Sequence, residues 1–181
     1  AIDNLIAETK KLQELQLTPD SPEALAALPS LEIQDVPKEI EKYPLEIKNQ
    51  GDSKILFHDL FTNDIAYIQI GFNTHSVPDE MIPYISLLGT VVLGMGTGRH
   101  SYTEISKLIG MHTGGIRTSH FSSATVQDRY QVLSYIFFSG KALLEKVDSL
   151  FDIFDELLGD SSFDDHKRLV EIIRSAKSDM E

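Results

Sequence analysis

The chain has 181 residues, of which 41% are hydrophobic and 24% charged, and this composition is typical of a folded globular protein. It contains no cysteine, which excludes disulfide frameworks, thiol catalysis and cysteine-ligated zinc. A formal net charge of −12 argues against nucleic acid binding, which needs a basic face, and no apolar run approaches the length of a membrane span.

The two ends of the sequence indicate a segment of a longer protein. The chain begins at Ala1 rather than at a methionine, and it shows no basic and apolar leader. It ends in a charged helical stretch, RLVEIIRSAKSDME, without a polar tail. A small processed protein would share these features, but we expect further chain beyond both ends.

The first 43 residues predict helices followed by an extended connector. Apolar residues of the first sixteen recur at helical spacing, and a second short helix follows with Asp20 or Ser21 as its N-cap and Pro22 in its first turn. Three prolines then interrupt LPSLEIQDVPKEIEKYPLEI, which favours a semi-rigid connector. We therefore place a boundary between residues 1–43 and a globular body over 44–181.

The body opens with candidate strands over 45–48, 54–60 and 64–73. The third alternates, and its more apolar side, predicted to face the core, consists of Ala66, Ile68, Ile70 and Phe72. Residues 78–96 follow as one helix, apolar on nearly all sides and so predicted to be fully buried. A short helix over 101–110 has a capping box of Ser101 and Glu104, with Gly110 as its predicted stop.

Two strands and two helices complete the predicted body. Residues 115–126 and 129–140 are rich in β-branched and aromatic residues, as strands are. Residues 141–159 form the clearest amphipathic helix, with a solvated face that carries Lys146, Asp148, Asp152 and Asp155, and a last helix covers 164–180. This order predicts an α+β fold in which helices pack on one face of a mainly antiparallel sheet.

The stretch GMGTGRHSYTEI, residues 94–105, invites a comparison with phosphate-binding loops. A Walker loop has the form GxxxxGK[ST], but Gly94 and Gly98 are one residue too close and Arg99 replaces the lysine. The dinucleotide fingerprint GxGxxG also fails, since its third glycine comes one residue early. A glycine-rich turn that ends the preceding helix is the favoured interpretation.

Metal and nucleophile sites are weighed in the same way. No histidine has another three to five residues away, so no helical ligand pair exists. His100 and Glu104 are spaced for one helical face and would need a third ligand such as His112 or His120, so a solvated cap is favoured over a metal site. No serine lies in a GxSxG elbow, and FDDHK, residues 163–167, is interpreted as a helix cap.

Several stretches together resemble a known family. The connector ALPSLEIQDVPKEIEKYPLEI and the segment from Leu60 to Ser119 are similar to the insulinase-type (pitrilysin) zinc metallopeptidases, in the branch of presequence protease and falcilysin. The resemblance implies four similar α+β domains of the LuxS/MPP-like type, paired in two halves that a helical hinge joins around a peptide-degrading chamber. It also implies a zinc site in the first domain, on an HxxEH helix followed by a glycine-threonine or glycine-serine turn.

In this chain Gly96-Thr97 matches that turn, but the helix before it departs from the family pattern. The ligand histidines would fall at Leu87 and Val91 and the catalytic glutamate at Thr90, where the sequence reads Leu87-Leu88-Gly89-Thr90-Val91. Leucine and valine offer zinc no donor, and threonine is no general base for the attacking water. We therefore expect an inactive third domain that follows the end of the hinge, and we assign no catalytic, cofactor-binding or metal-binding residue.

The resemblance implies a non-catalytic domain of a zinc-dependent peptidase that degrades unfolded peptides, forming part of the chamber wall. Its partners would be the other domains of the parent chain and the parent's peptide substrates, and zinc would lie in the parent's first domain. A bacterial cytoplasmic location is favoured, with an organelle matrix for a eukaryotic source. Two alternatives stay open, namely a stand-alone inactive scaffold subunit beside an active zinc peptidase, and an enzyme with a metal at His100, Glu104 and His112.

Overall fold

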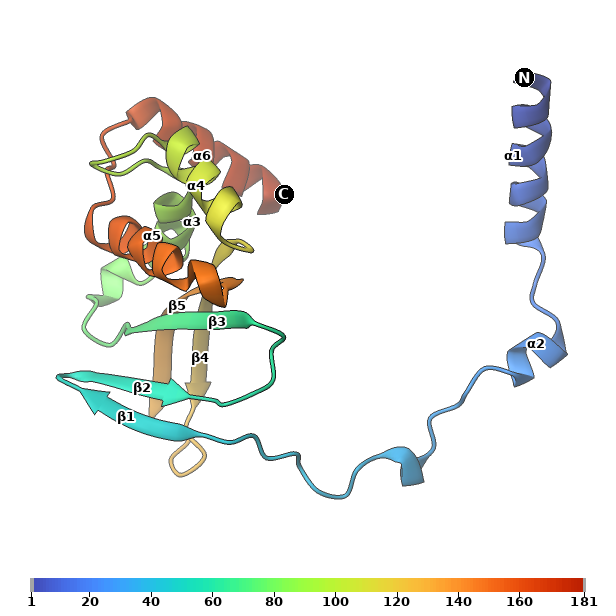
Figure 1. Cartoon of the computed structure of the whole chain (residues 1–181), viewed down its shortest axis with the longest axis horizontal. Helices are drawn as coiled ribbons and strands as arrows, with labels where there is room; N and C mark the ends of the chain where they lie inside the picture. The colour runs from blue at the N-terminus through green and yellow to red at the C-terminus, as the bar shows by residue number, and fades with distance from the viewer. Residues whose placement is uncertain (1, 181) are drawn as a thin grey trace. The chain divides into compact units, whose positions relative to one another are not determined.

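The computed structural model describes residues 2–180 and shows an α+β fold with antiparallel strand pairing, as predicted (Figure 1). The chain divides into two compact units, Ala1–Asp59 and Leu60–Glu181. The predicted end of the hinge after residue 43 is a different kind of boundary, and it stays a prediction.

The first unit begins with the helical segment that the sequence predicts. Helix α1 covers Ile2–Leu17, and helix α2 covers Pro22–Ala26. Ser21 is the N-cap of α2, where its hydroxyl accepts a hydrogen bond of 3.1 Å from the backbone N–H of Ala24. The connector that follows contains one short 3₁₀ turn, Ile33–Asp35, and every described residue of this unit is exposed.

A two-stranded hairpin closes the first unit. Strands β1, Glu46–Gln50, and β2, Ser53–Phe57, pair antiparallel with Gln50 opposite Ser53. Gly51 in the turn has φ of 59°, a left-handed conformation that glycine adopts without strain. These strands lie where the sequence predicts them.

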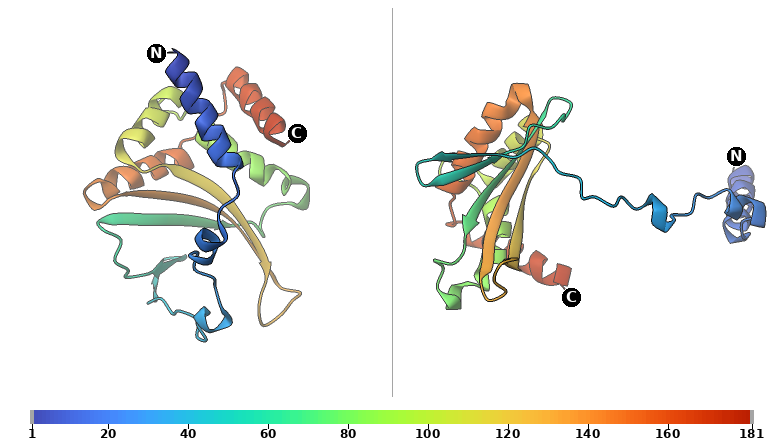
Figure 2. Two further views of the ribbon diagram at one scale, coloured as in Figure 1. Left: turned by 90° about the vertical axis from the view of Figure 1, so that its right-hand side faces the viewer. Right: turned by 90° about the horizontal axis from the view of Figure 1, so that it is seen from below.

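The second unit is built on a three-stranded antiparallel sheet in the order β3-β5-β4. Strand β3 covers Ile65–Asn73, β4 covers Ile116–Ala124, and β5 covers Val132–Leu143 and lies between the other two (Figure 2). The register places Ile70 and Thr118 on either side of Phe138. The predicted inner face of β3 is confirmed at Ile68 and Ile70, which pack on the core, whereas Phe72 stays half exposed and meets Phe138 edge to face.

Four helices cover one face of this sheet. They are α3, Tyr84–Gly94, α4, Tyr102–His112, α5, Val147–Gly159, and α6, His166–Met180. The core between helices and sheet contains Ile105 of α4, Phe138 of β5 and Leu150 and Phe154 of α5, all nearly inaccessible to solvent. No helix within residues 2–180 is long and apolar enough to cross a membrane.

Three predicted helix limits are wrong. Residues 78–96 form a 3₁₀ turn, Asp79–Met81, and then α3, because Pro83 interrupts the run. Helix α3 is also not fully buried, since Tyr84 and Leu88 on its outer side are 59% and 46% exposed. Helix α4 continues through Gly110 to His112 and ends where the Thr113 backbone and hydroxyl donate to the Ile109 carbonyl.

The predicted start of the helix over 141–159 is the third difference. Residues 141–143 continue strand β5 as far as Leu143, which pairs with Ile65 of β3, and a 3₁₀ turn, Leu144–Lys146, precedes α5. Pairing with β3 outweighs the helical periodicity of these residues. The predicted polar face of α5 is confirmed at Asp148, Asp152 and Asp155, which are not buried.

Candidate functional site

The three positions at which the family resemblance expects zinc chemistry lie together on helix α3. Val91 is buried at 5% exposure, Leu87 is partly buried, and Thr90 is exposed. The Thr90 hydroxyl donates to the carbonyl of Ser86 one turn earlier, at 3.4 Å. This set contains no side chain that binds zinc and no carboxylate that could take a proton from water, so it does not fit a metal site.

Helix α6 packs against α3 at these positions. Val91, Met95 and Ile172 form a small buried cluster, with Leu87 and Leu169 packed at its edge. The end of the contact is polar, because the Arg168 guanidinium donates from Nε to the carbonyl of Gly94 at 3.1 Å. The same guanidinium lies 4.3 Å from the centre of the Tyr102 ring, a cation–π arrangement that joins α6 to α4 as well.

The turn between α3 and α4 is held by its own backbone. The Thr97 N–H donates to the carbonyl of His100 at 2.8 Å, while the Thr97 hydroxyl accepts from the N–H groups of Arg99 and His100. A Cβ atom on Gly96 would lie 2.8 Å from the His100 carbonyl oxygen, a distance that real side chains do not adopt. The predicted reason for this glycine, a tight exit from the helix, is confirmed at Gly96.

A buried carboxylate on α5 fixes this turn. The Glu156 Oε1 atom accepts a hydrogen bond from the Thr97 hydroxyl and lies 2.8 Å from Nδ1 of His100. Its side chain is 7% exposed, and that of His100 is 39% exposed. Burial alone would raise the pKa of Glu156, but the hydrogen bonds from Thr97 and His100 and the charges of His100 and Arg99 together lower it, so the carboxylate form is favoured.

Arg99 adds two ion pairs on the exposed side of the turn. Its guanidinium lies 3.3 Å from a carboxylate oxygen of Asp155 and 3.4 Å from one of Asp160. The hydrogen bond to Asp155 is the largest cause that raises the pKa of Arg99, and Asp160 and Glu156 act in the same direction. The arginine that stands in place of the Walker lysine is therefore engaged by the protein's own carboxylates.

The alternative metal site of His100, Glu104 and His112 is not brought together. Glu104 closes the predicted capping box, since its carboxylate accepts from the backbone N–H of Ser101 at 2.9 Å and from its hydroxyl at 2.7 Å. These bonds lower the pKa of Glu104. His100 is directed to Glu156 and His112 lies at the far end of α4, and within residues 2–180 no group of three or more His, Asp or Glu side chains could hold a metal.

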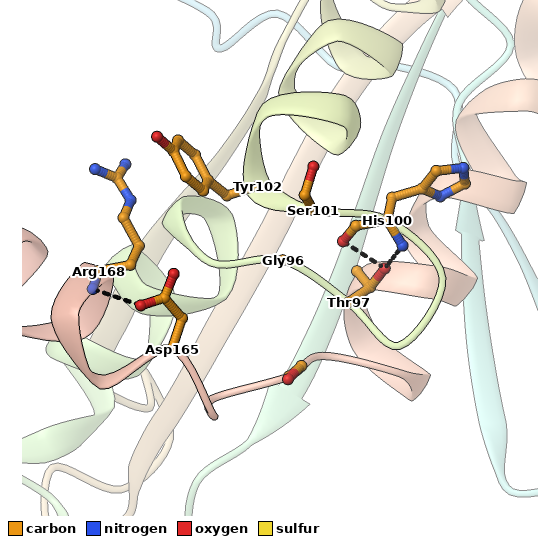
Figure 3. A pocket seen from close by; sticks show the side chains of 8 residues that line it. Gly96, Thr97, His100, Ser101, Tyr102, Asp165 and Arg168 are labelled. Atoms are coloured by element: carbon orange, nitrogen blue, oxygen red, sulfur yellow. Dashed lines mark hydrogen bonds between the residues drawn. The ribbon is translucent and has the colours of Figure 1, made fainter.

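One shallow pocket of about 190 Å³ lies beside the turn (Figure 3). Its charged side chains already have partners. Asp165 accepts from the N–H of Arg168 at 3.0 Å, which confirms that the FDDHK stretch caps a helix, and Arg168 is held by Gly94 and Tyr102. The pocket is lined by residues from α4, α6 and the adjoining loops: Gly96, Thr97, His100, Ser101, Tyr102, Ser162, Asp165 and Arg168.

Sequence reasoning missed the two side chains that organise this region. Glu156 lies between the core residues Ile153 and Leu157 on α5, so a carboxylate at a core position of the helical period is the signal that could have found it. Arg168 carries no such signal, because its contacts with Gly94 and Tyr102 depend on how α6 packs.

The chain is similar to much longer proteins. It is 35% identical to Protein HypA of Clostridium perfringens over 180 residues, 99% of this chain and 18% of that protein. Presequence protease 1, chloroplastic/mitochondrial, of Arabidopsis thaliana is 36% identical over 177 residues, 98% of this chain and 16% of that protein. The mitochondrial presequence protease of Kluyveromyces lactis is 33% identical, with 93% and 17% covered.

The chain therefore spans less than a fifth of the length of each of these relatives. A domain family described as associated with peptidase family M16, subfamily C, matches residues 1–181. This match agrees with the resemblance to insulinase-type peptidases that the connector and the Leu60–Ser119 segment carry. The chain belongs to this peptidase-associated domain family.

Proposed function

We propose that this chain is a non-catalytic domain of a longer zinc-dependent peptidase that degrades unfolded peptides, and that it forms part of the wall of the peptide chamber. One observation carries the proposal. The helix that would hold the zinc ligands has Leu87, Thr90 and Val91 in their places, and Val91 lies buried against α6. A helix face that packs in a core cannot also bind a metal and water.

The names of the relatives support the peptidase part of the proposal, since two of the three are presequence proteases. The small share of each relative that is covered supports a domain of a larger chain. In such a protein the zinc would belong to another domain, and the other domains of the parent chain and its peptide substrates would be the partners of this one. A bacterial cytoplasmic or an organellar parent fits the relatives equally well.

The first experiment tests catalysis. The purified 181-residue chain is analysed for zinc by elemental analysis and incubated with a fluorogenic unfolded peptide. We expect no stoichiometric zinc and no cleavage. Zinc at one atom per chain together with peptide cleavage would overturn the proposal and favour an independent enzyme.

The second experiment tests the larger chain. The gene is sequenced on both sides of the region that encodes these residues. We expect one reading frame with an HxxEH domain upstream. A start codon directly before Ala1 would instead favour the stand-alone inactive scaffold subunit.

The third experiment tests the chamber wall in the full-length protein. A photo-crosslinking amino acid replaces either Tyr67, on the sheet face that no helix of its unit covers, or Phe151, which is 51% exposed on α5. We expect a trapped substrate peptide at position 67 and much less at 151. Equal trapping at both positions, or none at 67, contradicts the wall role.

A further inference from the structure

The sheet of the second unit has one face that none of the unit's described helices covers. Side chains alternate along a strand, so the residues opposite the core point to this second face. The register of β5 with β3 and β4 identifies them. We call this set the open face, and its central members are Tyr67, Gln69, Arg117, Phe121, Tyr135, Phe137, Ser139 and Lys141.

Aromatic rings form the middle of the open face. The rings of Tyr135 and Phe137 stack with centroids 5.7 Å apart, and the Phe137 ring lies over Gly71, where a Cβ atom would clash with it. Gly71 thus leaves the space in which this ring lies on the sheet. Phe121 and Tyr67 extend the apolar surface and are 46% and 65% exposed. Exposed aromatic groups in one patch mark interaction sites more often than scattered ones do.

The charge of the open face is opposite to that of the chain. The chain has 28 Asp and Glu residues and a net charge of −12, yet strands β3, β4 and β5 contain no Asp or Glu. The two charged side chains of the open face are Arg117 and Lys141, and both are exposed. Within residues 2–180 neither of them makes an ion pair, although Arg99 and Arg168 both do.

A pocket of about 270 Å³ continues the open face at its Lys141 end. Lys141 and the apolar side chains of Ile65 and Leu143 line it from the sheet, and His112 and Lys146 line it from the adjoining segments. Among the described residues, no acidic side chain lines it. The Lys146 ammonium donates to the carbonyl of Met111 at 3.1 Å, so within residues 2–180 Lys141 is the lysine of this pocket that makes no such bond.

We propose that the open face binds an extended peptide segment in which carboxylates alternate with apolar or aromatic side chains. The apolar side chains would lie on Phe121, Tyr135 and Phe137, and a carboxylate would pair with Arg117 or Lys141. Arginine and lysine without ion-pair partners beside aromatic rings present charge and apolar area to the same ligand. The inference rests on the proposed chamber-wall role and extends it by naming the chemistry of the peptide that the wall accepts.

The net charge of the chain alone leads to the opposite expectation, that cationic peptides are attracted. Long-range attraction depends on the whole charge distribution, but a docked segment feels mainly the groups within about 10 Å at physiological salt. On the open face those groups are Arg117 and Lys141. The local charge therefore decides which peptide stays bound.

The test uses the 181-residue chain and a set of short fluorescent peptides of equal length. All share the same apolar residues and differ at the alternate positions, which hold Glu, Gln or Lys. Binding is measured by fluorescence anisotropy at low and at physiological salt. We expect the Glu peptide to bind most tightly and the Lys peptide most weakly, with the difference shrinking as salt rises. Equal affinities, a tighter Lys peptide or no binding by any of them overturns the inference.

Variants locate the binding. The double substitution Arg117→Glu with Lys141→Glu should weaken the Glu peptide by about tenfold, because two attractions become repulsions. The matched control is Lys107→Glu with Lys167→Glu, which makes a charge change of the same size at exposed positions of α4 and α6. If the control weakens binding as much as the double substitution, the open face is not the site.

A third variant keeps the test independent of charge. Phe121→Ser removes an exposed ring and should weaken both the Glu and the Gln peptides, while circular dichroism and the thermal midpoint verify that each variant is folded. Unchanged binding contradicts the aromatic part of the inference. Sedimentation that shows a dimer which the Glu peptide does not dissociate would assign the open face to a second copy of the chain and overturn the peptide.

Failure here and failure of the proposed function can be told apart. A chain that binds none of the peptides refutes the inference, while trapping of substrate at position 67 in the full-length protein would still support the chamber wall. Conversely, selective binding of the Glu peptide by a chain that proves to be a stand-alone subunit would support the inference and contradict the proposed parent.

Discussion

His100 and Glu156 meet at 2.8 Å although 56 residues separate them, and the carboxylate is buried while the imidazole is partly exposed. The pair fastens the turn after α3 to helix α5. Because the Thr97 hydroxyl also donates to Glu156, one buried carboxylate serves two donors of the same turn. A charge buried in this way is retained at low cost only while its donors stay in place.

Glu156→Gln should therefore destabilise the chain by about 1–3 kcal/mol, since a hydrogen bond to a charged group is replaced by a weaker one. The free energy of unfolding is measured by urea denaturation at neutral pH. Asp152→Asn on the exposed side of α5 is the control and should change it by less than about 0.5 kcal/mol. Equal effects of the two substitutions would show that the buried network adds nothing.

The same pair predicts a dependence on pH. The pKa of Glu156 is lowered in the folded chain, so its ionisation stabilises the fold above the ordinary value of 4.5, and this contribution is lost as pH falls through the lower folded value. The stability difference between the native chain and Glu156→Gln should thus be constant from about pH 7 to about pH 5 and shrink below pH 4.5. Urea titrations at several pH values measure it, and a difference that grows in acid would contradict the assignment.

Helix α3 offers a matched pair of truncations. Val91→Ala should cost about 2 kcal/mol, because it removes buried methyl groups from the contact with α6. Leu88→Ala on the outer side of the same helix removes more atoms, yet it should cost less than about 1 kcal/mol, since Leu88 is 46% exposed. Thermal unfolding compares the two variants, and a larger loss for Leu88→Ala would show that the face of α3 with Val91 is not the packed one.

Two glycines should respond to the same substitution with opposite sign. Gly96→Ala places a methyl group against the His100 carbonyl and should destabilise by about 1–3 kcal/mol. Gly110→Ala, inside α4 with no described atom near the new methyl group, should stabilise by about 0.5–1 kcal/mol. Both are measured by urea denaturation, and destabilisation by Gly110→Ala would mean that this glycine has a role in α4 beyond its local conformation.

The fold could be predicted from the sequence wherever a local pattern and its burial agree. Alternation in Ile65–Asn73 and the cap at Ser101 are signals within a few residues, and both elements form as predicted. The limits failed where partners are remote. Leu143 pairs with Ile65, far earlier in the chain, so strand pairing extends β5 into a helical pattern. Gly110 stays helical because nothing nearby forces the left-handed turn that a glycine stop needs.

The candidate site was predictable as a loss but not as a structure. The positions of Leu87, Thr90 and Val91 follow from counting back from Gly96-Thr97, which needs only the sequence. The roles of Glu156 and Arg168 require the packing of α5 and α6 against the turn, and a one-dimensional pattern does not contain that packing. A carboxylate among core residues of α5 was the one available hint.

The contact between α6 and α3 bears on how easily this chain could regain a metal centre. Ile172 and Leu169 cover the face of α3 that carries Leu87 and Val91, and Arg168 fastens the end of that face at Gly94. Two histidines and a glutamate placed there would be shut away from water and would compete with the packing of α6. The change in α3 is therefore held in place by its neighbour, and reversal by stepwise substitution would have to begin in α6.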